Sequence, residues 1–85
     1  MRHEREHYGE RELMLVFVAR RLKDALRVEA LFTEAGVDYV VEPDAYQAGV
    51  LFRSRRIGAF FYVAPEDDTA ARTALQHGGF SPYSE

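Results

Sequence analysis

The segment His3-Glu4-Arg5-Glu6-His7 has the residue types and the spacing of a zinc-binding helix. On an α-helix, His3 and His7 would lie one turn apart on one face and could share a Zn²⁺, with Glu4 placed as a general base for hydrolysis. A third ligand would have to come from elsewhere in the chain, and the only other histidine is His77. The motif alone therefore indicates a metal-dependent hydrolase.

The residues around the motif favour a different interpretation. A zinc-hydrolase helix is embedded in apolar sequence that shields the metal, whereas residues 1–11 are mostly charged or histidine and Gly9 would end a helix at once. We therefore predict no catalytic metal and no cofactor, and His3 and His7 remain the only metal candidates. We expect residues 1–11 to form a flexible charged tail ahead of a single domain, residues 12–85.

A second candidate site consists of arginines that the expected fold brings to one edge of a sheet. In that fold, the end of the expected first strand, residues 12–19, lies beside the start of the expected third strand, residues 57–64. Tyr46 lies in the connection before this third strand. Guanidinium groups in such a cluster suit an anionic small molecule, such as a phosphate, or an acidic protein surface. The alternative is a solvated rim, partly neutralised by Glu42 and Asp44. The arginines are Arg20, Arg21, Arg53, Arg55 and Arg56.

The stretch RRIGAFFYVAP, residues 55–65, shares basic and aromatic residues with the RNA-recognition strand, in which exposed rings stack on bases. Its register differs, because Ile57 takes a position where that motif has an aromatic residue. The net charge of -3 also disfavours nucleic acid. Packing in a core or an interface is the preferred role of Phe60, Phe61 and Tyr62, with weak RNA binding as an alternative.

Composition narrows the class of protein further. The 85 residues are 47% hydrophobic and 29% charged, which is typical of one small globular domain. The absence of cysteine excludes disulfides, thiolate nucleophiles and cysteine-zinc sites. The longest apolar runs, LMLVFVA and FFYVA, are too short to span a bilayer, and the charged N-terminus does not resemble a signal peptide. We expect a cytoplasmic protein without a membrane partner.

The spacing of apolar residues predicts four strands and two helices. Strands over 12–19 and 57–64 are apolar on both faces, and a strand over 37–42 alternates. Helices are expected over 22–35 and from Pro65 to Gly78. Residues 43–56 form a loop or a loop with a short strand at 50–53, and Pro82 confines a last strand over 80–83 to a sheet edge. The expected apolar side of the first helix contains Leu22, Ala25, Leu26, Ala30 and Phe32.

This β-α-β-β-α-β order predicts a ferredoxin-like α+β fold with strand order 4-1-3-2 and both helices on one face of an antiparallel sheet. The other face would be unusually apolar. Patches of that kind rarely stay exposed on soluble proteins. We therefore predict a homo-oligomer, a sheet-on-sheet dimer or a higher ring, with the N-terminal segment or residues 43–56 as alternative covers. The expected interface residues are Met14, Val16, Val18, Phe60 and Tyr62.

Two stretches resemble a family of small prokaryotic domains classed as signal-transducing proteins. VFVARRLKDALRVEALFTEAGVDYVVE has the strand, the helix rich in Ala, Glu and Leu, and the AGV step into a second strand. FFYVAPEDDTAARTAL is similar to the third strand, turn and closing helix of that family. The resemblance covers about Leu13 to Phe80. It implies a fold similar to that of nitrogen-regulatory PII proteins, whose partner-binding loop corresponds to residues 43–56, and it brings no catalytic residue. We expect a non-enzymatic regulatory or binding module.

Overall fold

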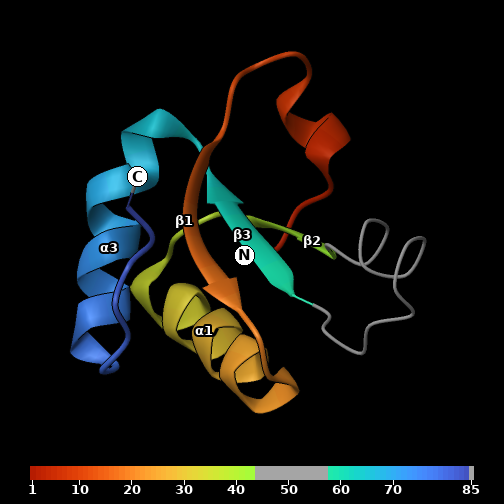
Figure 1. The fold of residues 1–85 in the computed structure, drawn as a ribbon. Coiled ribbons are helices and arrows are strands. Elements are labelled where there is room, and N and C mark those ends of the chain that lie inside the picture. Colours follow the sequence, from red (N-terminus) through yellow and green to blue (C-terminus); the bar gives the residue numbers. More distant parts are fainter. Residues whose placement is uncertain (44–57, 85) are drawn as a thin grey trace, which may run out of the picture.

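The computed structural model describes residues 1–43 and 58–84. A 3₁₀ helix, η1 (Arg5–Tyr8), precedes strand β1 (Met14–Ala19), helix α1 (Leu22–Ala35) and strand β2 (Val40–Pro43). Strand β3 (Ala59–Val63), the 3₁₀ turn η2 (Pro65–Asp67) and helix α3 (Asp68–His77) follow, as Figure 1 shows. The predicted loop over 43–56, with its short strand at 50–53, lies outside the described residues except for Pro43.

The sheet is antiparallel and has three strands in the order β1-β3-β2. This order agrees with the predicted arrangement of the first three strands. The predicted fourth strand over 80–83 is not formed: the chain passes beside β1 and is held there by the Tyr83 amide, which donates to the Val16 carbonyl over 2.7 Å. Pro82 has no amide hydrogen to extend a ladder of hydrogen bonds. The described architecture is therefore a small α+β domain with a three-stranded sheet.

Both helices pack on one face of this sheet. Gly36 ends α1 in the left-handed conformation at φ 74°, and the Val37 amide donates to the Phe32 carbonyl, the hydrogen bond of a Schellman motif. Pro65 opens η2, where a missing amide hydrogen costs nothing. The core between the layers is entirely apolar, and its largest fully buried side chains include Phe32, Phe61, Leu75, Val16, Val28 and Val63.

A register shift in β1 changes which of its side chains face the helices. Leu15 pairs with Tyr62 and Phe17 pairs with Phe61, so Val16 between them is the extra residue of a bulge. Val16 is fully buried in the core cluster, and its assignment to an oligomer interface is therefore wrong. Strict alternation failed here because a bulge adds one residue to the period of two.

The remaining predicted interface residues divide between two environments. Val18 pairs with Phe60, and both are half-buried on the face of the sheet opposite the helices, as is Tyr62. Met14 pairs with Val63, a core residue, and is 40% exposed. Leu15, which pairs with Tyr62, joins the face opposite the helices in place of Val16.

The N-terminal segment, residues 1–11, packs against the sheet on the side of β2. The His3 amide donates to the Tyr39 carbonyl over 2.8 Å, and the Tyr39 amide donates to the Met1 carbonyl over 3.0 Å, which forms a short parallel bridge. The Arg5 guanidinium donates to the Glu42 carboxylate over 2.6 Å and lies 5.0 Å from the centre of the Tyr62 ring. Figure 1 shows this segment in red, beside β2 and above the start of β1.

Val40 shows that this segment covers part of the open face. It pairs with Tyr62, so it points away from the helices, and yet it is only 2% exposed. It belongs to no part of the helix-side cluster. Tyr62 and Glu42 are the neighbours of Val40 on that face, and the Arg5 guanidinium contacts both of them. The alternative cover predicted for the open face is thus present on its β2 side, while the flexibility of residues 1–11 stays a prediction.

Glu29 of α1 has a partly buried carboxylate, which requires polar partners. The Tyr39 hydroxyl donates to its Oε1 over 2.8 Å, and the Arg2 guanidinium lies 3.8 Å from the same atom. Burial of the phenol, together with this hydrogen bond to a carboxylate, raises the pKa of Tyr39 from 10.0 to about 12. The network joins the N-terminal segment, α1 and the residue that precedes β2.

Tyr39→Phe tests this network through the pH dependence of stability. Because the folded pKa exceeds the unfolded value, the hydroxyl contributes stability below pH 10 that disappears between pH 10 and about 12, roughly 2–3 kcal/mol in all. We expect the free energy of unfolding, measured in urea from pH 9 to 11.5, to fall less steeply in Tyr39→Phe. The matched control Tyr83→Phe removes a hydroxyl from an exposed ring and should follow the unmodified protein. Identical slopes for all three proteins would contradict the network.

Arg5→Ala tests the contact between the N-terminal segment and the sheet. The change removes two hydrogen bonds to Glu42 and the contact with the Tyr62 ring. Because both partners are partly exposed, we expect the free energy of unfolding to fall by only about 1 kcal/mol at low salt, and by less in 1 M NaCl. Glu6→Ala in the same helix η1 is the control, and an equal effect of both changes would argue against the contact.

Candidate functional site

The cationic side chains of the described residues separate into two groups. Four arginines form ion pairs, all in the N-terminal segment or in α3: Arg2 with Glu29, Arg5 with Glu42, Arg11 with Glu66 and Arg72 with Asp68. The other four cations have no ion pair within residues 1–43 and 58–84, and all are exposed. They are Arg20, Arg21, Lys23 and Arg27, and we call them the basic end of α1.

The local chain path explains why these cations gather. β1 ends at Ala19 and α1 begins at Leu22, so Arg20 and Arg21 form the turn between them. Lys23 and Arg27 then follow one helical turn apart. Arg21 occupies the N-cap and makes no side-chain capping bond, so the first amides of α1 add their partial positive charge. Asp24 is the acidic residue of the first turn.

Two leucines lie beside these cations on the surface. Leu22 is 76% exposed and Leu26 is 57% exposed, and Ala30 one turn later is also exposed. Their assignment to the apolar side of the helix was wrong. The side that packs against the sheet and α3 consists of Ala25, Val28, Leu31 and Phe32. We call the surface of Leu22, Lys23, Leu26, Arg27 and Ala30 the outer face of α1.

The sequence contains a signal that could have identified this face. Ala25, Val28, Leu31 and Phe32 already complete one stripe at helical spacing, which is as much as a helix buries on one side. Leu22 and Leu26 form a second stripe and are each followed directly by a cation. Helix α1 already has a complete buried side. A second stripe of leucines beside lysine and arginine therefore indicates that these leucines are exposed.

Only two arginines of the predicted cluster lie among the described residues. Arg20 and Arg21 are at the expected place, and Ala19 pairs with Ala59, so the end of β1 does lie beside the start of β3. The other members of that prediction, Tyr46, Arg53, Arg55 and Arg56, lie outside the described residues. Arg56 precedes the first residue of β3 by three positions.

The histidine motif does not form the helix that zinc binding requires. η1 begins at Arg5, so His3 lies before it. The His3 and His7 rings stack with centroids 3.9 Å apart and planes 12° apart, and stacked rings direct their nitrogen lone pairs alongside each other instead of toward one point. His3 Nε2 lies 3.2 Å from Asp38 Oδ1. Among the described residues, no group of three His, Cys, Asp or Glu side chains could hold a metal ion.

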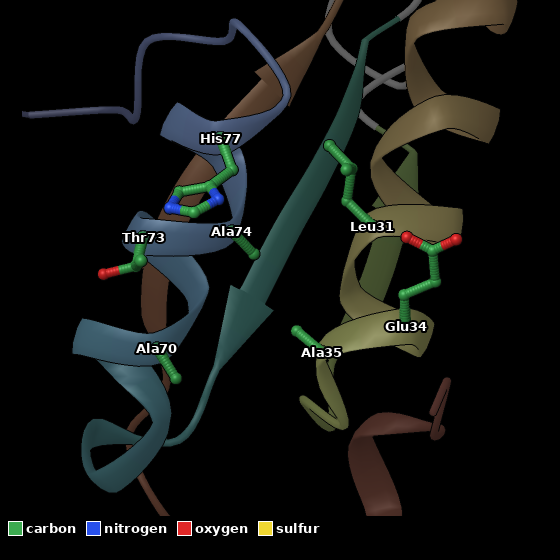
Figure 2. Close-up of a pocket in the computed structure, with 7 residues that line it drawn as sticks. All are labelled: Leu31, Glu34, Ala35, Ala70, Thr73, Ala74 and His77. Atoms are coloured by element: carbon green, nitrogen blue, oxygen red, sulfur yellow. The ribbon is translucent and has the colours of Figure 1, made fainter.

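A shallow groove of about 490 Å³ separates α1 from α3 on the outside of the helical layer. Figure 2 shows Ala35, Ala70 and Ala74 facing the space between the helices, with Glu34 and Thr73 pointing away from it. Leu31 and His77 complete the lining. The groove is mainly apolar and its lining contains no lysine or arginine, so it is chemically distinct from the basic end of α1.

Comparison with protein-family models, with curated proteins and with solved structures finds no match at a significant level. In the described part of the chain, no helix has both the length and the apolar character needed to cross a membrane.

Leu26→Gln tests the exposure of the outer face directly. A side chain that is already mostly in water contributes little burial energy, so we expect the free energy of unfolding to change by less than about 0.5 kcal/mol. Val28→Ala, two residues away and fully buried, should cost about 2 kcal/mol because it leaves a cavity. Urea unfolding monitored by circular dichroism measures both. A large loss in Leu26→Gln would show that this leucine is covered in solution.

Proposed function

We propose that the protein is a non-enzymatic binding module that takes an anionic partner at the basic end of α1. One observation carries this proposal: the four unpaired cations of the described residues are adjacent in the chain and in space, while every other described lysine or arginine is ion-paired. Surface ion pairs are individually weak. All the other lysines and arginines among the described residues are ion-paired, so the four cations without an ion pair indicate a binding site for an anionic partner.

The electrostatics of the whole chain support the same proposal. The formal net charge is -3, so a concentrated cationic end makes the molecule strongly dipolar. An anionic partner would be attracted to that end and repelled by the rest of the surface. Such steering raises the association rate and favours one orientation, and it falls with ionic strength because exposed charges are screened beyond about 10 Å at 0.1 M salt.

The proposal also includes the fold family of the domain and the biological role of binding. We propose a ferredoxin-like architecture, in which residues 80–84 take the place of the fourth strand beside β1. The resemblance to the signal-transducing domains supports a regulatory role for the binding event. Arg53, Arg55 and Arg56 would add charge to the same site, since the chain enters β3 next to the end of β1.

Self-association through the open face of the sheet is also retained as a proposal. The N-terminal segment covers its β2 side, so the surface left for a second copy is the β1 side, with Leu15, Val18 and Phe60, each half-buried in a single chain. This area is smaller than the one expected from the sequence. The interaction with an anionic partner does not depend on it, because the basic end lies on the helical side of the sheet.

Binding of pyrophosphate, followed by amide chemical shifts on the full chain, tests the proposed function. Among the described residues, we expect saturable shifts at residues 20–27, and we expect the affinity to fall at least fivefold between 50 and 200 mM NaCl. The variant with Arg20, Arg21, Lys23 and Arg27 all changed to alanine should lose them. Arg72→Ala, which removes a paired arginine from α3, is the control and should keep them.

Two outcomes would contradict the proposed site. Shifts centred on the N-terminal segment or on α3 would place the anion elsewhere. Shifts that survive in the fourfold variant would show that the unpaired cations do not bind it. The fourfold variant should fold normally, because none of the four side chains makes an ion pair within the described residues.

A further inference from the structure

We infer that the anionic partner is an acidic amphipathic helix of another protein, which docks on the outer face of α1. This inference rests on the proposed function and adds the identity of the partner. It comes from a separate observation, the exposure of Leu22 and Leu26 beside the cations. A free phosphate or other small anion would use the cations and leave both leucines in water.

The outer face has the geometry of a helix-docking surface. Leu22, Leu26 and Ala30 follow each other at intervals of four residues, so they form one stripe along the helix. Lys23 and Arg27 form a parallel stripe directly beside it. Eight residues at 1.5 Å each give the leucine stripe a length of about 12 Å, which corresponds to two turns of a partner helix. Partner helices of this kind bind through apolar residues at intervals of three and four.

The energetics favour an occupant that meets both stripes. Burying an exposed leucine side chain in an interface stabilises a complex, and both leucines are largely exposed in the free protein. Flanking cations select against apolar partners that carry lysine or arginine, because like charges would approach each other across the interface. The complementary surface is therefore an apolar stripe bordered by glutamate or aspartate.

The described part of the chain offers no such helix to a second copy. The apolar residues of α3, among them Ala71, Ala74 and Leu75, are buried in the core. The first-turn carboxylate of Asp68 is already paired with Arg72, and Glu66 is paired with Arg11, which holds the pKa of Glu66 below its usual range. Among the described residues, a second copy therefore has no helix that complements the outer face, and we assign the partner to a protein of different sequence.

A lipid surface fits less well than a protein helix. Helices that lie in a membrane interface carry a broad apolar face with aromatic residues, whereas the outer face of α1 has two leucines and one alanine. The net charge of -3 would also oppose the approach of the whole protein to an anionic bilayer. Membrane binding is accordingly one outcome that the test must separate.

The probe is a fluorescently labelled 16-residue peptide with leucine along one helical face and glutamate on both edges, titrated with the full chain and followed by anisotropy. Two matched peptides serve as controls: one has the same composition with the leucines scattered, and the other has lysine in place of glutamate. We expect the first peptide to bind at least tenfold more tightly than either control. Its affinity should fall with increasing salt.

Protein variants separate the two stripes. Leu22→Gln with Leu26→Gln should weaken peptide binding at least tenfold and leave the pyrophosphate shifts unchanged. The fourfold alanine variant at Arg20, Arg21, Lys23 and Arg27 should weaken both. Circular dichroism confirms folding, and Leu22→Ala with Leu26→Ala replaces the glutamine pair if that pair is unfolded.

The outcomes distinguish this inference from the proposed function. Equal binding of the ordered and scattered peptides, no binding of either, or no effect of the leucine changes would overturn the inference. Retained pyrophosphate shifts would then still support the proposed function, and loss of both would overturn the two together. Leucine-dependent binding to phosphatidylglycerol vesicles in place of the peptide would assign the face to membranes. A leucine-dependent dimer in sedimentation, or protection of Leu22 and Leu26 by residues 44–57 in the free protein, would likewise overturn it.

Discussion

The contact between Phe32 of α1 and Phe61 of β3 determines how the rest of the domain is arranged. The two rings lie 6.0 Å apart, and the Tyr39 ring lies 5.4 Å from Phe32 and 6.0 Å from Phe61. Edge-to-face and tilted packing of this kind holds α1 at one rotation about its axis. Once that rotation is set, Val28 must point into the core, and Leu22 and Leu26 must point to water.

The same contact links the core to the N-terminal segment. Tyr39 presents its ring to Phe32 and its hydroxyl to Glu29, while its backbone pairs with residues 1–3. The N-terminal segment has too few apolar residues to form a core, and it is held against the sheet by backbone hydrogen bonds and ion pairs. The arginines of this segment all form ion pairs. In the described part of the chain, unpaired positive charge is therefore concentrated at the basic end of α1.

The two ends of β1 thus differ in electrostatic character. Next to its start, Arg11 pairs with Glu66, and the Arg5–Glu42 pair lies across the sheet on β2. At the end of β1, Arg20 and Arg21 enter a helix whose own dipole adds positive charge. Figure 1 shows the first turn of α1 next to the end of β1, and the N-terminal segment beside β2. Unpaired positive charge gathered at one place on a chain of net charge -3 favours a directional, charge-steered contact.

The sequence by itself determined the elements whose signals are local. Helix α1 has the predicted bounds because Gly36 supplies the left-handed stop, and the strand order β1-β3-β2 follows from the right-handed crossover rule. Tertiary structure alone decided the bulge that buries Val16 and the absence of a strand over 80–83. It also selected the rotation of α1 that exposes Leu22 and Leu26. Each depends on which neighbour an apolar residue meets. The sequence of α1 offers two apolar stripes, and packing against the aromatic rings of the sheet selects the one that is buried.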